Sequence, residues 1–219
     1  MSTAATPGST PSDPIAPLRR FVAGMTELVD TPRAEAEILA RGSALMAELI
    51  RDDAWLPDAF AQPHPDRYCQ YLLHCDPRER FSVVSFVWGP GQRTPIHDHT
   101  VWGIVGVLRG TEHVQRYARD AAGRFVPQGE LLVAQRGAIE TVSPAIGDVH
   151  VVSNPLTDRA SISIHVYGGN IGAIRRHRLD EAGAVHEFVS GYDNDVLPNL
   201  WRRATAVRND ELERREILE

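Results

Sequence analysis

After Pro57 the chain becomes a succession of short runs rich in Val, Ile, Phe and Tyr, and this texture constrains the fold more than any other feature. Gly, Pro and Asp residues interrupt the runs at near-regular intervals, as turns do between strands. Many short strands at such spacing predict an all-β sandwich or barrel. The predicted strands span residues 68–74, 81–88, 94–97, 103–108, 111–118, 130–134, 139–142, 149–153 and 160–167.

Two helices are predicted before the strands. Over residues 14–28 the apolar side chains follow steps of three and four residues, which is typical of an amphipathic helix. A second helix is predicted over residues 33–50, with Thr31 and Pro32 as its cap and first-turn proline.

A chain of 219 residues fits one domain with short appendages. We expect a disordered tail over residues 1–13, which are rich in Ser, Thr, Pro and Ala and lack the features of a signal peptide. The domain itself is expected over residues 14–205. A charged C-terminal tail follows over residues 206–219, with a frayed helix from residue 209.

Charge and cysteine content restrict the partners. The formal net charge is -6, which gives no electrostatic footprint for nucleic acid or for an anionic membrane. No run of apolar residues is long enough to span a bilayer. The two cysteines, Cys69 and Cys75, fit neither a disulfide scaffold nor a zinc knuckle, and reduced thiols indicate the cytoplasm. The sequence leaves the oligomeric state open.

The strongest local signal is the segment from Gly91 to His99, which ends in His97-Asp-His99. Histidines at positions i and i+2 of a strand point to the same face, where both imidazoles can bind one metal ion. A solvated pair or a pair within the core is the other interpretation of these two histidines.

A second segment, from Pro144 through Gly147 and His150 to Asn154, favours the metal. The two segments together resemble the two cupin motifs, with Gly91, His97, His99 and Gly110 in register in the first of them. The resemblance implies a cupin, jelly-roll type β-barrel with the two N-terminal α-helices in front, and metal ligation by His97, His99 and His150. Gly103 stands where the first motif has a glutamate, so all three ligands are neutral and an anionic thiolate can neutralise part of the metal's charge. The histidines alone leave zinc, copper, nickel and manganese open beside iron.

Ser163, His165 and Tyr167 alternate with aliphatic residues in the last predicted strand. The three polar side chains therefore share one face. That face is either solvated or, beside a buried metal, a hydrogen-bond relay that ends in a phenol.

Three histidines followed by Ser-x-His-x-Tyr resemble the cysteine dioxygenase family of thiol dioxygenases. The resemblance extends over roughly residues 68–178. It implies one Fe(II) per chain and O2 as co-substrate, which together convert a small thiol to its sulfinate. Tyr167 is then catalytic, with Ser163 and His165 holding it in position.

Two positions depart from the animal-type members of that family. Gln70 stands where they have an arginine that binds the cysteine carboxylate, and Gly103 stands where they have a cysteine that crosslinks to the tyrosine. Both features resemble the bacterial Gln-type branch, which implies 3-mercaptopropionate as the favoured substrate and L-cysteine as the second. In that branch the carboxylate partner corresponds to Arg176, next to Arg175, and Gln70 and Tyr167 complete the substrate site.

Two other functions remain open from the sequence. One is a cupin enzyme of different metal or specificity, such as an isomerase. The other is a non-catalytic, metal-binding cupin that serves as a small-molecule-binding module, because a fold does not fix a function.

Overall fold

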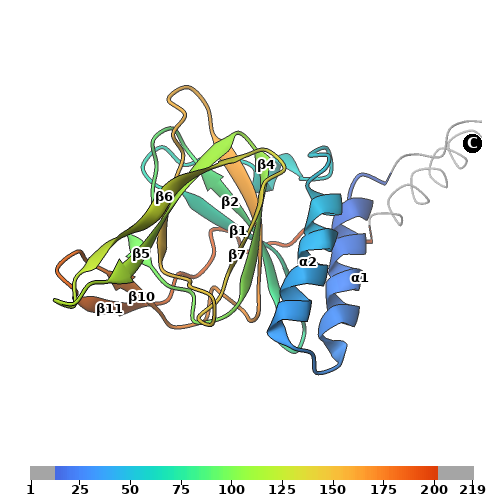
Figure 1. Ribbon diagram of the computed structural model, residues 1–219. Helices are drawn as coiled ribbons and strands as arrows, with labels where there is room; N and C mark the ends of the chain where they lie inside the picture. The colour runs from blue at the N-terminus through green and yellow to red at the C-terminus, as the bar shows by residue number, and fades with distance from the viewer. Residues whose placement is uncertain (1–12, 202–219) are drawn as a thin grey trace, which may run out of the picture.

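The computed structural model describes residues 13–201 and consists of two helices beside a β-barrel (Figure 1). The two α-helices are α1 (Ala16–Asp30) and α2 (Glu35–Leu49), and a short 3₁₀ helix, η1 (Asp58–Phe60), follows them. The strands are β1 (Cys69–Cys75), β2 (Ser82–Trp88), β3 (Ile96–His97), β4 (Gly103–Arg109), β5 (Thr111–Arg119), β6 (Phe125–Gln135), β7 (Ile139–Val142), β8 (His150–Ser153), β9 (Ser161–Tyr167), β10 (Arg176–Leu179) and β11 (Val185–Phe188). The predicted C-terminal tail and helix lie outside the described residues, as do residues 1–12 of the predicted N-terminal tail.

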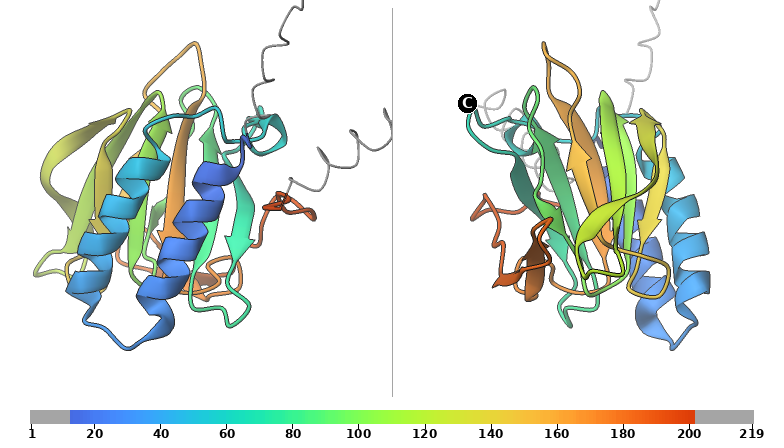
Figure 2. Two further views of the ribbon diagram at one scale, coloured as in Figure 1. Left: turned by 90° about the vertical axis from the view of Figure 1, so that its right-hand side faces the viewer. Right: turned by 60° about the vertical axis from the view of Figure 1, so that its left-hand side comes forward.

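The strands form two antiparallel sheets that curve around a common interior (Figures 1 and 2). One sheet has the order β1-β2-β9-β4-β7, and the other has the order β11-β10-β3-β8-β5-β6. The sequence prediction of a cupin β-barrel with two N-terminal helices is confirmed. Strands distant in the sequence become neighbours in this topology, and β3, β8 and β10 meet in the second sheet.

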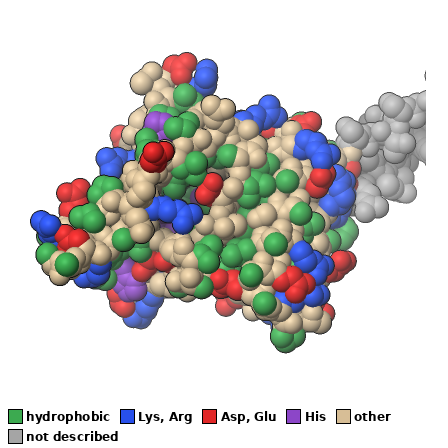
Figure 3. Space-filling view, viewed as in Figure 1, with side chains coloured by type: hydrophobic (Ala, Val, Ile, Leu, Met, Phe, Trp, Pro, Cys, Tyr) green, Lys and Arg blue, Asp and Glu red, His purple; other side chains and the backbone are tan. Residues whose placement is uncertain are grey.

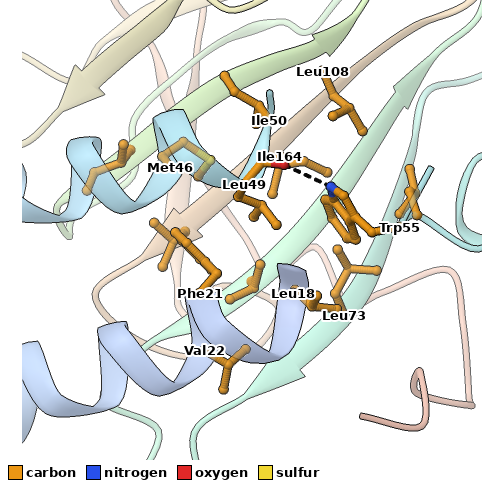
Figure 4. Close-up of a cluster of buried hydrophobic side chains, with 14 of the residues drawn as sticks. Leu18, Phe21, Val22, Met46, Leu49, Ile50, Trp55, Leu73, Leu108 and Ile164 are labelled. Atoms are coloured by element: carbon orange, nitrogen blue, oxygen red, sulfur yellow. Dashed lines mark hydrogen bonds between the residues drawn. The ribbon is translucent and has the colours of Figure 1, made fainter. Parts of the chain in front are cut away.

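Both helices lie on the outer face of the first sheet (Figure 2). Their apolar stripes bury Leu18, Phe21 and Met46 against that sheet, and the indole N–H of Trp55 donates a hydrogen bond to the Leu49 carbonyl at 2.9 Å (Figure 4). Each such side chain contributes about 1.5–3 kcal/mol when it is fully buried. The aliphatic residues of β9 belong to this cluster, so the opposite face of β9 points into the barrel.

Several predicted element bounds are wrong. Thr31-Pro32 ends α1 and does not begin α2, because Thr31 is extended at φ -117° and ψ 146°, as residues before a proline prefer. Ala34 precedes the first turn of α2. Strand β3 is shorter than predicted and β6 is longer.

Two short strands, β10 and β11, were not predicted at all. Strand β10 has the sequence Arg-His-Arg-Leu, which shows no alternation of apolar and polar side chains. It is a strand because it pairs with β3 on one side and with β11 on the other. Long-range pairing therefore decides the structure here.

Charges of both signs are interspersed over the face seen in Figure 3. The exposed apolar side chains include Leu131, Leu132 and Val133 on the edge strand β6. Within residues 13–201, no helix has the length and apolar character to cross a membrane.

Candidate functional site

The three predicted ligand histidines converge inside the barrel. His97 on β3 is paired directly with His150 on β8, and His99 follows β3 by two residues. The ring centroids are 4.8 Å apart for His97 and His99, and 4.9 Å apart for each of the other two pairs. One ring nitrogen from each residue lies within 4.8 Å of the others, and all three side chains are buried. This group contains no carboxylate.

Two of these rings have a backbone acceptor beside Nδ1. His97 Nδ1 lies 3.2 Å from the Pro95 carbonyl oxygen, and His99 Nδ1 lies 3.1 Å from the Asp148 carbonyl oxygen. With Nδ1–H donating to these carbonyls, the lone pair of Nε2 is free to bind a metal.

Burial keeps the three imidazoles neutral. It lowers the pKa of His97 to about 4 with help from Arg176, and burial together with the neighbouring histidines lowers the pKa of His99 and His150 well below the usual range. Metal ligands must be unprotonated, so three neutral imidazoles at this spacing fit a divalent transition metal.

The loop that carries His99 is fixed by two aspartates. Asp98 Oδ1 accepts from the backbone N–H of His177 at 2.8 Å, and Asp98 N–H donates to the His177 carbonyl at 3.2 Å. Asp148 Oδ2 accepts from the backbone N–H groups of His99 and Thr100 at 3.0 and 3.1 Å. These contacts end β3 at His97 and hold Thr100 at φ 60°, a left-handed conformation that is unusual for threonine. His99 therefore reaches the site from a clamped turn and not from the predicted strand.

The histidines open onto a cavity of about 490 Å³. Aromatic side chains form much of its wall, among them Tyr68, Phe86, Trp88 and Tyr192. The cavity also contains cationic groups, so a small organic anion fits both its size and its charge.

Ser163, His165 and Tyr167 share the inner face of β9 and form a continuous hydrogen-bond chain, called the Ser–His–Tyr chain below. Ser163 Oγ lies 2.8 Å from His165 Nε2, and His165 Nδ1 lies 2.8 Å from the Tyr167 hydroxyl. All three side chains are buried, so their face is not solvated. Burial lowers the pKa of His165 to about 3 and raises the pKa of Tyr167. The Tyr167 ring stacks on His99 with centroids 5.5 Å apart.

The two neighbouring arginines point in opposite directions. Arg176 is 3% exposed and lines the cavity, whereas Arg175 has a side chain 78% exposed, with Nη1 3.6 Å from Glu187 Oε2. Arg176 donates from Nη2 to Ser190 Oγ at 2.7 Å and lies over the Phe188 ring at 4.8 Å. Its Nε has no hydrogen-bond partner among residues 13–201, and no carboxylate of that range forms a salt bridge with it. Burial lowers the pKa of this guanidinium.

Gln70 also borders the cavity. Its side-chain amide donates to the Gly191 carbonyl at 2.6 Å, and its backbone N–H donates to Asp193 Oδ2 at 2.6 Å. Gln70 therefore ties the loop around Gly191–Asp193 to β1. This contact was not foreseen from the sequence.

Some residues of the site were missed by sequence reasoning. Arg178 lines the cavity because it is two residues from Arg176 on β10 and shares its face, and the sequence did not reveal this strand. Asp148 and Glu112 are separated from their partners by long stretches of chain. The segment around Glu112, Thr-Glu-His-Val-Gln, shows no alternation of apolar and polar side chains, so no local signal distinguishes this buried carboxyl from an exposed one.

Residues 2–180, more than half of the chain, match the protein family described as cysteine dioxygenase type I. Among solved structures, the chain is similar to an acetylacetone dioxygenase from Acinetobacter johnsonii, with 18% identity, coverage of 61% of this chain and 81% of that chain, and a TM-score of 0.43. It is also similar to a protein with a double-stranded β-helix domain from Klebsiella pneumoniae, with 20% identity, coverage of 52% and 87%, and a TM-score of 0.41. An RmlC-like cupin protein from Desulfovibrio desulfuricans is 24% identical, with coverage of 49% and 89% and a TM-score of 0.37.

Proposed function

The chain belongs to the cysteine dioxygenase type I family, and from that membership we propose that it is an iron(II)-dependent dioxygenase of a small thiol carboxylate. The favoured substrate is 3-mercaptopropionate, with L-cysteine second, and the product is the sulfinate. The proposed iron ligands are His97, His99 and His150.

The observation that carries this proposal is the buried guanidinium of Arg176, which has no carboxylate partner within residues 13–201, beside three neutral imidazoles. A buried charge is costly unless it has a partner. Neutral ligands also leave the full charge of a divalent ion uncompensated. A thiolate that carries a carboxylate supplies one negative charge for each of these two positive groups.

Iron(II) bound by the three histidines supplies the redox chemistry that joins dioxygen to sulfur. Arg176 binds the substrate carboxylate through its planar guanidinium, which suits a carboxylate well. Tyr167 donates a hydrogen bond to the substrate or to oxygen, and His165 and Ser163 hold the phenol in place. The aromatic walls keep water away from the reacting thiolate.

The surroundings of Gln70 favour a substrate without an amino group. Asp193 is a carboxylate that lines the cavity and is therefore a candidate partner for an ammonium. It already pairs with Arg67 and accepts from the Gln70 backbone. A cysteine ammonium would have to compete for this carboxylate, whereas 3-mercaptopropionate has no such requirement.

Oxygen uptake by the iron(II)-loaded protein tests the proposal, with 3-mercaptopropionate and L-cysteine supplied separately and the sulfinate identified by mass. A higher kcat/KM for 3-mercaptopropionate is expected. A preference for L-cysteine would retain the dioxygenase and overturn the substrate assignment. Uptake with neither thiol would leave a metal-binding cupin of another function.

A further inference from the structure

Glu112 is a carboxyl group buried inside the barrel, and the proposed mechanism does not use it. Its residue is 1% exposed and lies on β5, opposite Ala134 of β6. It forms no salt bridge within the described part of the chain. Ser161 Oγ donates a hydrogen bond to Glu112 Oε1 at 2.9 Å. A buried acid without a cation is costly as a carboxylate, so its neutral form is favoured.

This carboxyl lies at the start of the Ser–His–Tyr chain. Ser161 and Ser163 are two residues apart on β9 and share one face, which places Ser163 beside the acid. Hydrogen bonding from Ser163, Ser161 and Trp88 lowers the pKa of Glu112 against the larger effect of burial. The Trp88 indole N–H also donates to Ser163 Oγ at 3.2 Å. Glu112 therefore extends the Ser–His–Tyr chain of hydrogen bonds to four groups, from β5 to the phenol that borders the cavity.

The direction of the hydrogen bonds along this chain depends on its two ends. His165 is neutral and carries one ring N–H, so it donates at one nitrogen and accepts at the other. An ionised Glu112 can only accept. The Ser163 O–H then points to Glu112, His165 Nε2–H points to Ser163, and His165 Nδ1 accepts the Tyr167 O–H. A neutral Glu112 donates to Ser163, which reverses every bond and leaves the Tyr167 O–H free to point into the cavity.

We propose that Glu112 is a positioning residue whose neutral form directs the Tyr167 hydroxyl proton into the substrate cavity through Ser163 and His165. Ionisation of Glu112 turns that proton back towards His165. This assignment rests on the proposed thiol dioxygenase function, because in that function the Tyr167 hydroxyl donates a hydrogen bond into the substrate cavity. The substrate-facing group is Tyr167, and Glu112 acts through it.

The titratable and charged neighbours of Glu112 come from several strands. Arg116 lies on β5, Glu140 on β7, His150 on β8 and His165 on β9. The first three border, with Glu112, a cavity of about 20 Å³, enough for about one water molecule. Arg116 Nη2 lies 3.8 Å from Glu140 Oε2, so its charge is already engaged. None of these four groups is among the causes of the raised pKa of Glu112, which burial brings to about 7.

The sign of the pH dependence follows from that shift. Glu112 is neutral below its raised pKa of about 7 and ionised above it. The kcat of the iron-loaded protein is therefore expected to fall about tenfold between pH 6 and pH 8 as the neutral form is lost. Glu112→Gln keeps the size and the donor of the neutral acid but cannot ionise. Its kcat is expected to change by less than about twofold over the same range, with unchanged iron content.

Glu140→Gln is the matched control, because Glu140 borders the same small cavity but is not part of the hydrogen-bond chain from Glu112 to Tyr167. It should keep the inflection of the parent protein. Ser163→Ala breaks the chain, so adding Glu112→Gln to it should produce no further change in the pH profile. An inflection that persists in Glu112→Gln, or a double variant whose profile differs from that of Ser163→Ala, would overturn the proposal.

Infrared spectroscopy supplies a readout that needs neither activity nor a Glu112 variant. In the metal-free Glu140→Gln protein, the C=O band of a protonated buried carboxyl should disappear as the pH rises through about 7. Absence of a titrating band would refute the assignment even if Glu112→Gln failed to fold. If neither thiol is oxidised while this band titrates, the proposed thiol dioxygenase function is wrong, and the assignment of Glu112 as a buried titrating acid is retained. If a thiol is oxidised but kcat shows no Glu112-dependent inflection, the proposed function is retained and the positioning role of Glu112 is wrong.

Discussion

Gly103 on β4 is paired directly with Tyr167 on β9, and the tyrosine ring occupies the space where a side chain at position 103 would begin. A Cβ built on Gly103 would lie 2.8 Å from Tyr167 Cδ1 and 2.9 Å from Val142 Cγ2. Glycine at this position therefore lets the phenol lie against the strand, beside His99 and His165.

The first prediction concerns the covalent state of Tyr167. The chain has two cysteines, and both lie on β1, whereas position 103 carries no thiol. We therefore expect no cysteine–tyrosine crosslink, before or after turnover. Denaturing gel electrophoresis should give one band, and the peptide that contains Tyr167 should have its unmodified mass. A doublet, or a Tyr167 peptide joined to a cysteine-containing peptide with the loss of two hydrogens, would contradict this.

Replacement of a single ligand histidine should remove the metal. His97→Ala, His99→Ala and His150→Ala are each expected to abolish iron retention and thiol-dependent oxygen uptake together, because two imidazoles leave the site incomplete. Elemental analysis after gel filtration measures the iron. His186→Ala is the control, since His186 is exposed on β11. Full activity in any one of the three ligand variants would remove that residue from the ligand set.

Loss of the phenol hydroxyl should impair turnover and spare the metal. Tyr167→Phe is expected to lower kcat about 10- to 100-fold with full iron content, because the Ser–His–Tyr chain then ends at His165. Tyr117→Phe changes a phenol outside the cavity and should behave like the parent protein. Equal kcat values for Tyr167→Phe and the parent would show that the Ser–His–Tyr chain has no role in turnover.

The contrast between Arg176 and Arg175 tests carboxylate binding. Arg176→Met should raise the KM for 3-mercaptopropionate about 10- to 100-fold, because a charge-assisted hydrogen bond contributes about 1.5–3 kcal/mol. The KM for a thiol of similar size without a carboxylate should rise much less in Arg176→Met. Arg175→Met removes a guanidinium that points to solvent and should leave KM within about twofold. The reverse ranking of the two variants would assign the carboxylate to Arg175.

Asp148 should control metal affinity without contributing a ligand. Asp148→Ala leaves the backbone N–H groups of His99 and Thr100 without their acceptor, so the turn that carries His99 loosens. A loss of about 10- to 100-fold in metal affinity is expected, as measured by competition with a chelator. Asp158→Ala, on an exposed loop, is the control. Unchanged affinity in Asp148→Ala would mean that the turn holds its shape without this carboxylate.

Local patterns in the sequence were sufficient for the helices, for most strands and for the candidate ligands. The amphipathic stripes of α1 and α2 follow the helical period, and the alternation in β9 separates Ser163, His165 and Tyr167 from their aliphatic neighbours. The histidines stand in short motifs with tight turns. Each of these signals lies within about ten consecutive residues, so it can be read from the local sequence without knowledge of the tertiary structure.

Tertiary structure decided what depends on partners far along the chain. Strand β10 exists because β3 and β11 pair with it, and that pairing turns Arg176 inward and Arg175 outward. Glu112 is buried because β9 lies across the barrel from β5, and no pattern around residue 112 distinguishes it from an exposed acid. The sequence therefore determined which chemical groups are present and which of them share a strand face. The sheet order determined which groups meet in one dry cavity, because burial and charge pairing are properties of packed strands and not of single ones.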